Sequence, residues 1–513
     1  MQVGRALISV YDKTGLDVFA RGLSDLGVEI VASGGTSAYL AEHGIDVVPV
    51  EELTEVPELL GGRVKTLHPA IHAGILARRR LEADLDELRE HDIRTFDLVC
   101  VNLYPFQSVT SRRNVREEDA VEMIDIGGPA LLRAAAKSFV DVVPVCEASR
   151  YEEILRELAG GGVSLDTRRK LAAEAFAHTA AYETSIAAWF ADVETFPPRL
   201  LLSLEREQGL AYGENPHQRA AYYAEAGVRR HLLSRVDMLG GRELSFNNLN
   251  DLDAARSLLR EFTLPTGVIV KHASPCGVAV AATIEEAYAK ALASDPVSAY
   301  GGIVALNRTV SPELAERLSE QFVEVLIAPE YDEGALTTLR GKEALRILRD
   351  RERRGASPGD RDYRRVLGGF LVQDTDVEVD DREGMTVVSE TAPDETGWGD
   401  LLFAWRVAKH VGSNAIVIAK DLQAIGIGGG QTSRVDAVRL ALEKASEQGH
   451  DLAGAVLASD AFFPFPDGPR LALDAGVRTI VQPGGSKRDA EVVAAVEEAG
   501  GVMVFTSRRH FRH

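Results

Sequence analysis

Short apolar runs rich in β-branched residues alternate with helical patterns along almost the whole chain, and this alternation restricts the fold most. In the first part, strands are predicted at 5–10, 28–33, 45–50, 96–103 and 140–145. Helices are predicted at 15–26, 36–43, 129–138 and 167–192. Alternation of this kind, with glycine in the turns, is typical of an α/β fold built on a mainly parallel, doubly wound sheet.

A linker is predicted where the segment ETFPPRL interrupts the alternation at Pro197-Pro198. We therefore expect one domain at 1–196 and a second at 199–513. No internal repeat is apparent, and the basic stretch 345–365 predicts a solvated insertion. After the linker, strands are predicted at 267–271, 302–306, 322–328, 366–372, 415–419, 454–459, 478–482 and 502–506.

The charge balance argues against two classes of partner. A formal net charge of −21 repels nucleic acid and anionic membranes, and no apolar run is long enough to span a bilayer. The first residues do not resemble a signal peptide, and three cysteines in 513 residues suit a reducing compartment, so we expect a cytoplasmic protein. An anionic small substrate would need local lysines and arginines backed by oriented backbone N–H groups.

One candidate anion seat is Ser33-Gly34-Gly35-Thr36, which follows a predicted strand and opens a predicted helix. Glycines there let the backbone approach a ligand closely, and the first N–H groups of the helix point toward it. Taken alone, the motif is better explained, by about two to one, as an ordinary turn whose hydroxyl caps the helix.

Other polar residues are predicted to reach the same sheet edge. Ser9 and Lys13 follow the first strand, and Arg63 and Lys65 are spaced to face one way on an extended segment. The segment Ile124-Asp125-Ile126-Gly127-Gly128 precedes a helix that carries Lys137. A lone lysine in a loop is normally a solvated charge, but several cations and glycine turns at one sheet edge are less easily explained in that way.

The motifs SVYDKTGL, ASGGTSAYL, GGRVKTLHPAIHAGIL, VNLYPF and IDIGG followed by LLRAAAK are similar to a known family. They resemble the inosine monophosphate (IMP) cyclohydrolase domain of bifunctional purine biosynthesis enzymes, whose fold is similar to methylglyoxal synthase. The resemblance implies catalytic roles around the cyclising atoms for Lys65, Tyr104, Asp125 and Lys137. It also implies that the substrate is held by Ser9, Lys13, Ser33, Gly35, Thr36, Arg63 and Thr66.

A second constellation centres on Lys271 and His272 at the end of a predicted strand. A neighbouring ammonium favours the neutral imidazole, which can accept a proton, although for the dipeptide alone a solvent-facing strand end is the better explanation. Pro275-Cys276 suggests a zinc deaminase, but residue 279 is Ala and no H-x-E lies upstream in this segment. We therefore expect no metal and a free, buried or partly buried Cys276 thiol.

The motifs YGENPHQ, KHxxPCG, SDPVSAYGGI, GGGQTSR and SDAFFPF resemble the transformylase domain of the same family. Its fold is similar to a duplicated, metal-free cytidine deaminase. By resemblance, His272 accepts the proton when the amine of aminoimidazole carboxamide ribotide (AICAR) attacks the formyl group of 10-formyltetrahydrofolate. Lys271 would stabilise the oxyanion or protonate the leaving nitrogen, and Asn414 would orient the formyl group.

Substrate contacts in this second domain are also implied by the resemblance. They are Tyr212 for the substrate, Arg434 and Arg509 for anionic groups, Phe462, Phe463 and Pro464 for the folate border, and Glu324 for the pterin ring. The family usually has Arg before the Tyr of YGENPHQ, where this chain has Ala211, so one substrate-anion contact is missing or supplied elsewhere.

The resemblance thus implies formyl transfer to AICAR, giving formyl-AICAR (FAICAR), and then closure to IMP with loss of water. It implies a homodimer acting on small molecules with 10-formyltetrahydrofolate as co-substrate and no tightly bound cofactor. Two alternatives stay open at this point: a sensing module that only binds a phosphometabolite, and a zinc-dependent nucleobase deaminase.

Overall fold

The computed structural model describes residues 1–56, 60, 63–112, 114–191, 195–226, 236–352 and 355–513. The described chain divides into two compact units, Met1–Glu205 with Glu225–Arg229, and Arg206–Ala224 with Arg230–His513. The predicted linker prolines lie between the last long helix of the first unit, α10 (Leu165–Ala191), and the strand β6 (Leu204–Leu210). Within the described ranges, no helix combines the length and apolar character needed to cross a membrane.

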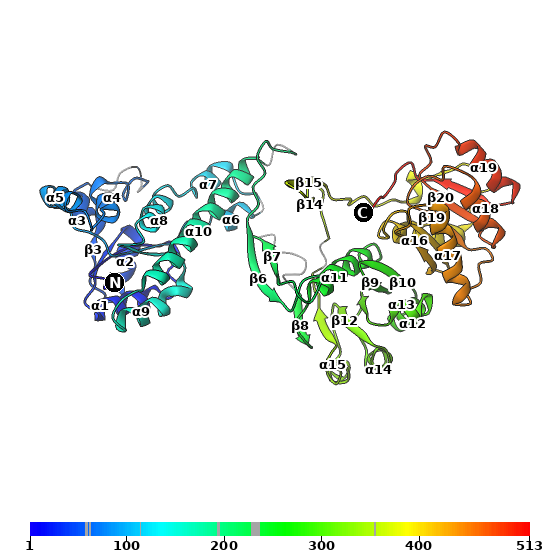
Figure 1. The fold of residues 1–513 in the computed structure, drawn as a ribbon, viewed down its shortest axis with the longest axis horizontal. Helices are drawn as coiled ribbons and strands as arrows, with labels where there is room; N and C mark the ends of the chain where they lie inside the picture. The colour runs from blue at the N-terminus through cyan, green and yellow to red at the C-terminus, as the bar shows by residue number, and fades with distance from the viewer. Residues whose placement is uncertain (57–59, 61–62, 113, 192–194, 227–235, 353–354) are drawn as a thin grey trace. The chain divides into compact units, whose positions relative to one another are not determined.

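The first unit is built on a parallel sheet in the order β3-β2-β1-β4-β5, as far as the described residues show. Its elements have the blue and cyan colours in Figure 1. This sheet confirms the doubly wound α/β prediction. The strands are β1 (Arg5–Ser9), β2 (Glu29–Ala32), β3 (Val48–Pro49), β4 (Leu98–Val101) and β5 (Val143–Val145). The strand predicted at 45–50 is shorter than expected, because the chain turns into helix α3 at Val50.

Helices cover both faces of this sheet because side chains alternate along each strand. In β1, Ala6 and Ile8 pack in one apolar cluster with α1 and α9, whereas Leu7 packs on the other face with α4, α8 and α10. The helices are α1 (Leu16–Asp25), α2 (Gly34–Glu42), α3 (Val50–Thr54), α4 (Pro69–Leu76), α5 (Glu82–Glu90), α6 (Phe106–Thr110), α7 (Glu117–Val121), α8 (Gly127–Lys137), α9 (Tyr151–Ala159) and α10.

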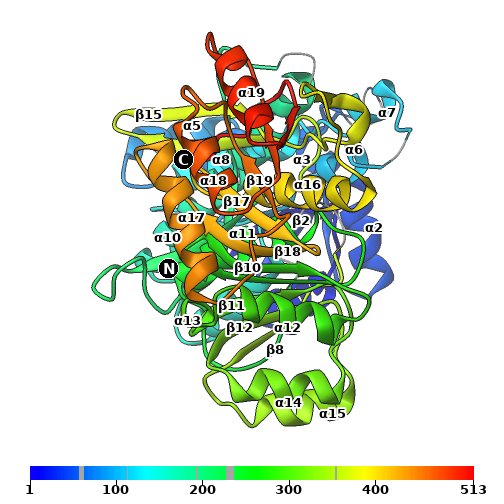
Figure 2. The same ribbon diagram turned by 90° about the vertical axis from the view of Figure 1, so that its right-hand side faces the viewer.

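The second unit is built on a large mixed sheet, with the described strands in the order β16-β21-β20-β19-β17-β18-β10-β9-β11-β12-β13-β8. Figure 2 labels strands from both halves, among them β10, β11 and β12 of the first and β17, β18 and β19 of the second. Its first half contains β8 (Asp237–Gly240), β9 (Thr266–Lys271), β10 (Ser274–Val280), β11 (Gly302–Leu306), β12 (Val323–Ala328) and β13 (Arg346–Arg349). Its second half contains β16 (Thr386–Val387), β17 (Ile416–Lys420), β18 (Gln423–Gly428), β19 (Val456–Ser459), β20 (Thr479–Gln482) and β21 (Val502–Phe505).

The two halves of this sheet repeat one topology. Hairpin β9–β10 corresponds to hairpin β17–β18, and outward from each hairpin the strands follow in the same order with the same directions. The expectation of no internal repeat is therefore wrong, and the duplication implied by the resemblance is confirmed. The repeat is hidden in the sequence because many different apolar residues satisfy the same buried positions.

Each half also carries an equivalent set of helices. The two central helices, α11 (Phe246–Leu259) and α16 (Glu395–Ala408), share one continuous apolar cluster with strands from both halves. The opposite face holds two separate clusters, one for each half. The helices there are α12 (Ile284–Ser294), α14 (Pro312–Glu320) and α15 (Glu333–Arg340) in the first half, and α17 (Arg434–Glu447), α18 (Asp467–Asp474) and α19 (Asp489–Glu498) in the second.

The stretch 345–365 corrects another prediction. Instead of a solvated insertion, its start forms β13 inside the large sheet, where Ile347 and Leu348 are fully buried. The guanidinium of the flanking Arg349 pairs with Asp237 and Glu330. A buried strand can therefore lie in a segment of basic composition. The strand predicted at 366–372 pairs elsewhere: β15 (Gly369–Asp374) forms an exposed hairpin with β14 (Arg361–Val366).

Close packing of α12 on β10 generates a prediction about Gly277. A Cβ atom there would lie 2.0 Å from the carbonyl oxygen of Ala291, and the equivalent Gly426 meets Ala441 in the same way at 2.3 Å. We expect Gly277→Ala to lower the free energy of unfolding by about 2–3 kcal/mol, because backbone must move to accept the methyl group. Urea unfolding measures this. Gly209→Ala, where an added Cβ meets open space, is the control and should change little.

Candidate active sites

The first candidate site lies at the carboxyl ends of β1 and β2, where α2 begins. Ser9 Oγ and Ser33 Oγ are 2.7 Å apart, and Ser33 is the residue that precedes the helix. Thr36 Oγ1 accepts from the Val10 amide and donates to the Val10 carbonyl, both at 3.1 Å. These hydroxyls fix the two loops together, so the first N–H groups of α2 face a defined space.

Two ammonium groups lie at this helix start. Lys13 Nζ donates to the carbonyl of Val10 and, at 3.2 Å, to that of Tyr11. Burial and the charge of nearby Lys65 lower the pKa of Lys13. A Cβ on Gly34 would lie 2.8 Å from Lys65 Nζ, so the Lys65 ammonium sits directly against the first turn of α2. Like charges held together beside a helix N-terminus make this a seat for an anion.

Asp125 lies beside the same lysine at the start of α8. Its Oδ1 accepts from the Gly128 amide at 2.8 Å. Burial raises the pKa of Asp125, and the Lys65 charge partly opposes that shift. The Tyr182 hydroxyl accepts from the Asp125 amide and donates to the Met123 carbonyl, each at 2.8 Å. We name Ser9, Lys13, Ser33, Thr36, Lys65, Thr66 and Asp125 the N-terminal cluster, with Thr66 Oγ1 packed against Gly127.

Tyr104 lies next to this cluster, whereas Arg63 faces a different partner. The Tyr104 ring is 5.4 Å from the Tyr11 ring, edge to face, on the loop that follows β4. Asn102 Oδ1 accepts from the Tyr11 amide at 2.5 Å and so ties this loop to the one after β1. Arg63 forms an ion pair with Glu122, and both side chains are more than half exposed. Its guanidinium is therefore held by a carboxylate and not by the hydroxyl groups of the cluster.

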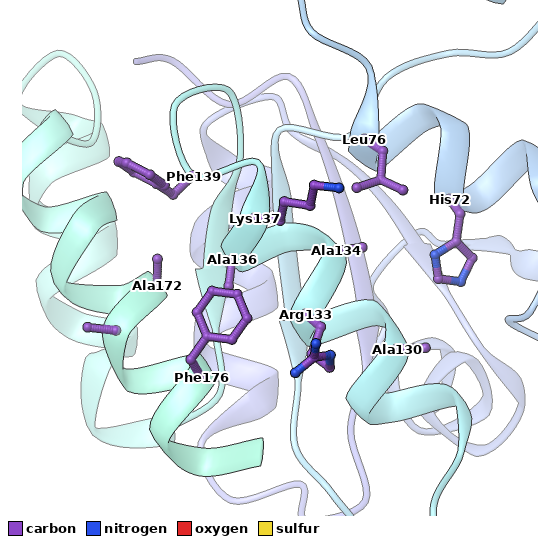
Figure 3. Close-up of a pocket in the computed structure, with 11 residues that line it drawn as sticks. His72, Leu76, Ala130, Arg133, Ala134, Ala136, Lys137, Phe139, Ala172 and Phe176 are labelled. Atoms are coloured by element: carbon purple, nitrogen blue, oxygen red, sulfur yellow. The ribbon is translucent and has the colours of Figure 1, made fainter. Parts of the chain in front are cut away.

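Lys137 does not join the N-terminal cluster within this chain, which corrects its predicted position. It is the last residue of α8, whereas Asp125 binds the first turn, and ten residues of helix span about 15 Å. Lys137 instead lines a shallow groove between α8, α4 and α10 (Figure 3). The neighbouring groove residues include His72, Leu76, Arg133, Phe139 and Phe176.

The second candidate site lies at one end of the large sheet. Pairing of Ile303 with Val270 places the start of β11 beside the end of β9. Pairing of Ile416 with Gly428 and with Ser459 brings the start of β17 beside the ends of β18 and β19. Loops from both halves therefore meet here. We name Lys271, His272, Asn414, Arg434 and Phe462 the C-terminal cluster.

Lys271 and His272 stand at the tight turn between β9 and β10. His272 and Ala273 both have left-handed backbone, with φ of 54° and 57°. Lys271 Nζ donates to the Tyr300 carbonyl at 2.7 Å, which leaves two of its hydrogens for other acceptors. The His272 side chain is exposed, and among the described residues its ring has no hydrogen-bond partner. The imidazole is thus open to a ligand.

Arg434 is held within its own chain by three of its five N–H donors, and its predicted contact with a substrate anion stays a prediction. The buried guanidinium pairs with the fully buried Asp460 at 2.5 Å and donates to Ser459 Oγ at 2.8 Å. It also donates to Asn414 Oδ1 at 2.7 Å, while Asn414 Nδ2 donates to the Gln431 carbonyl at 2.8 Å. Arg434 therefore fixes the Asn414 amide, which keeps one hydrogen and one lone pair for a substrate.

The aromatic segment after β19 divides between core and surface. Phe463 is 1% exposed and packs in the apolar cluster under α17, so it cannot border a ligand as predicted. Phe462 is 39% exposed, and Pro464 is exposed as well. Phe463 is therefore part of the apolar core, whereas Phe462 and Pro464 expose a surface that a flat ring can contact.

The remaining predicted contacts occupy separate places. Tyr212 is partly exposed, and its carbonyl accepts from the Phe246 amide at the start of α11. Glu324 accepts from Asn248 Nδ2 at 2.9 Å. Arg509 is exposed and stacks on Phe511, with its guanidinium carbon 4.7 Å from the ring centre.

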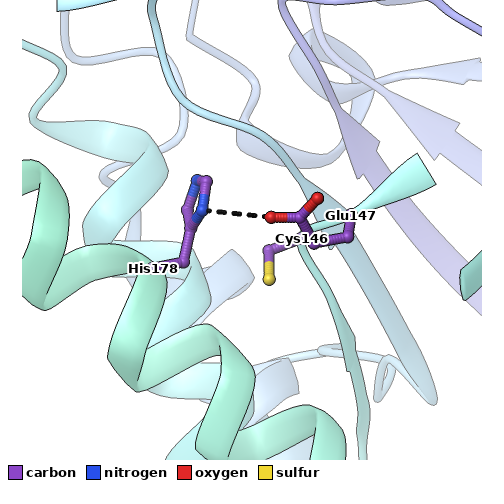
Figure 4. Close-up of side chains that lie close together, drawn as sticks. All are labelled: Cys146, Glu147 and His178. Atoms are coloured by element: carbon purple, nitrogen blue, oxygen red, sulfur yellow. Dashed lines mark ion pairs between the residues drawn. The ribbon is translucent and has the colours of Figure 1, made fainter. Parts of the chain in front are cut away.

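Cysteine thiols are potential metal ligands, so their surroundings bear on the predicted absence of a metal. Burial raises the pKa of Cys276 to about 12, and its Sγ contacts the Ile269 carbonyl at 3.5 Å, which confirms a free, partly buried thiol. Among the described residues, one group of three metal-type ligands clusters, and it is elsewhere: Cys146, Glu147 and His178 (Figure 4). Burial also raises the pKa of Cys146 to about 12, and His178 lies 3.6 Å from Glu147, so we interpret the group as a buried thiol beside an ion pair.

Some residues that shape these sites escaped prediction. Tyr182 holds the Asp125 loop but lies in no motif. Asn102 lies inside VNLYPF and Asp460 inside SDAFFPF, but the motifs alone do not indicate what these two residues do. Asp251, which accepts from the His272 and Ala273 amides, lies in helix α11 outside every quoted motif and was missed.

Comparison with known proteins identifies relatives over the whole chain. A family model described as "AICARFT/IMPCHase bienzyme" matches residues 135–444, and an "MGS-like domain" model matches 15–130. "Bifunctional purine biosynthesis protein PurH" of Listeria welshimeri is 47% identical over 99% of this chain and 100% of its own. The protein of the same name from Magnetococcus marinus is 46% identical over 100% of both chains. A solved structure, "Crystal structure of ForH", matches 37% of this chain and 100% of its own at 38% identity, with a TM-score of 0.33.

The tail that carries Arg509 generates a pH prediction through His510. Burial disfavours its charged form, but hydrogen bonds to Asp376 (2.5 Å) and Asp380 (2.7 Å) outweigh burial and raise the pKa of His510 to about 9. A raised pKa stabilises the fold fully below the unfolded value of about 6.5, and this stability is lost as pH rises through about 9. We expect a loss on the order of 2 kcal/mol between these pH values.

Chemical unfolding at pH 6 and pH 9.5 tests this expectation. His510→Gln should make the unfolding free energy less dependent on pH, whereas His450→Gln in the same unit should leave the dependence in place. An unchanged pH dependence in His510→Gln would show that other groups cause it.

Proposed function

The chain belongs to the AICARFT/IMPCHase bienzyme family, and we propose that its two clusters divide the two reactions of that bienzyme between them. As a member of this family it is a bifunctional enzyme of purine biosynthesis, a formyltransferase and an IMP cyclohydrolase. Neither a binding-only sensor nor a zinc deaminase agrees with that membership. The proposal assigns cyclisation to residues 1–196 and formyl transfer to residues 199–513.

The N-terminal cluster is proposed to cyclise FAICAR to IMP. In this step the carboxamide nitrogen attacks the formyl carbon, and one water leaves. The N-terminus of α2, with Lys13 and the hydroxyls around it, suits the ribotide phosphate. Lys65 lies between that seat and Asp125, so its ammonium can stabilise the developing oxyanion while Asp125 and Tyr104 order the amide.

The C-terminal cluster is proposed to transfer the formyl group from 10-formyltetrahydrofolate to AICAR. The ribotide amine attacks the formyl carbon, His272 accepts the amine proton, and tetrahydrofolate leaves. Lys271 provides positive charge for the oxyanion, and the Asn414 amide orients the carbonyl. The exposed Phe462 and Pro464 offer a surface for the folate. Arg434 acts through Asn414 in this scheme, and Phe463 has no part in it.

The observation that supports this division is that the N-terminal cluster lies at one end of the first sheet and the C-terminal cluster at one end of the large sheet, each within its own compact unit. Lysines gathered in this way give an acidic chain, with net charge −21, local positive charge for an anionic substrate. We further propose that the enzyme has no tightly bound cofactor, acts as a homodimer and works in the cytoplasm. Supplying AICAR with 10-formyltetrahydrofolate tests the whole scheme, and the expected product is IMP.

Lys65 provides the first test of the division. We expect Lys65→Ala to slow cyclisation of FAICAR by about 10²- to 10³-fold, because the oxyanion loses its nearest charge. Formyl transfer, measured separately with AICAR and 10-formyltetrahydrofolate, should not change. Lys170→Ala, an exposed lysine of α10, serves as the matched control. A normal cyclisation rate in Lys65→Ala would remove this residue from the mechanism.

His272 provides the complementary test. We expect His272→Ala to lower formyl transfer by about 10²- to 10⁴-fold, because no general base is left at the turn. Cyclisation of preformed FAICAR should continue at the normal rate. His450→Ala is the matched histidine control in the same unit. Loss of both activities in a folded His272→Ala protein would contradict two separate sites.

A further inference from the structure

The two hairpins at the centre of the large sheet are anchored in the same way. In the first, the amides of His272 and Ala273 donate to the two carboxylate oxygens of Asp251, at 3.1 and 2.7 Å. In the second, the amides of Asp421 and Leu422 donate to the two oxygens of Asp400, at 2.9 and 2.7 Å. Asp251 belongs to α11 and Asp400 to the equivalent helix α16.

The turn conformation explains why an anchor is needed. All four central residues have positive φ, between 52° and 57°, and none of them is glycine. Residues with a Cβ adopt this left-handed conformation reluctantly, so two-residue hairpins of this type prefer Asn-Gly. A carboxylate that accepts both exposed amides stabilises the turn and also fixes the direction in which its first central side chain points.

The two turns differ in the chemistry that they carry. The first carries Lys271 and His272, beside the loops that hold Asn414 and Arg434. At the equivalent positions the second carries Lys420 and Asp421, at the opposite end of the sheet. Lys420 Nζ is held by Asp451 at 2.7 Å and by the Ala453 carbonyl at 2.9 Å. One anchor therefore supports reactive groups, and its duplicate supports a turn without a histidine.

We propose that Asp251 is a positioning residue for formyl transfer, which sets the orientation of His272 and Lys271 through the turn backbone. This inference rests on the proposed function of His272. Asp251 accepts from backbone only in this arrangement and need not contact either substrate. Asp400 is the structural counterpart without a part in the chemistry, so the chain contains its own matched control.

The test compares Asp251→Asn with Asp400→Asn in the full-length protein. An amide can accept from one turn N–H but presents its own hydrogens to the other, so both variants disturb their turns. We expect Asp251→Asn to lower kcat for formyl transfer by about 10- to 100-fold with KM for both substrates within about twofold, since a shifted base misses its proton. Cyclisation should be unchanged. Asp400→Asn should keep kcat within about twofold, even where its Tm falls.

Three outcomes separate positioning from mere stability. Equal loss of formyl transfer in both variants, or normal kcat in folded Asp251→Asn, overturns the proposal. The double variant Asp251→Asn with Ala273→Gly should regain several-fold in kcat, because glycine adopts positive φ without strain; no recovery also overturns it. The double variant can also be measured if the single variant Asp251→Asn folds poorly. Full formyl transfer in His272→Ala would instead remove the proposed function of the histidine, and with it the basis for this role.

Discussion

Backbone N–H groups at the ends of strands need acceptors, and both sites are organised by the side chains that supply them. Thr36 accepts from Val10, Asp125 from Gly128, and Asp251 from the turn that carries His272. Each bond joins a loop to an element distant in sequence or to the first turn of a helix. These bonds help to position the catalytic side chains proposed here, because Lys65, Tyr104, Asp125, His272 and Asn414 all lie outside helices and strands.

Where periodicity and local turn chemistry decide the structure, the sequence was sufficient. The alternation in β1 and β2 predicted these strands to within a few residues, and the segment Ser33-Gly34-Gly35-Thr36 correctly marked the start of α2. Prediction failed where contacts between residues distant in sequence bury a segment whose local composition suggests exposure. Arginines around Ile347 suggested solvent, yet Asp237 and Glu330 neutralise Arg349 and allow a buried strand.

The candidate sites show the same limit at the level of single residues. A motif fixes which residues are near in sequence, but not which way each one faces. Phe462 and Phe463 are adjacent, and the chain direction sends one ring outward and the other into the core. Arg434 begins helix α17 and its acid, Asp460, directly follows β19, so the local sequence around the arginine does not reveal the pair. Lys137 and Asp125 share a motif, yet they lie at opposite ends of helix α8. Asp251 acts through backbone only, which no residue pattern reveals.

The apolar cluster that α11 and α16 share has a consequence for the history of the second unit. Either half of the sheet, taken alone, would expose the apolar face that it now buries against its sister half, so an ancestral half-length chain would have needed to pair with a second copy. Such a pair would have carried two identical turns under a common selection. Within one polypeptide the halves stay paired although their turns differ, so one turn can carry Lys271 and His272 while the other only supports the sheet.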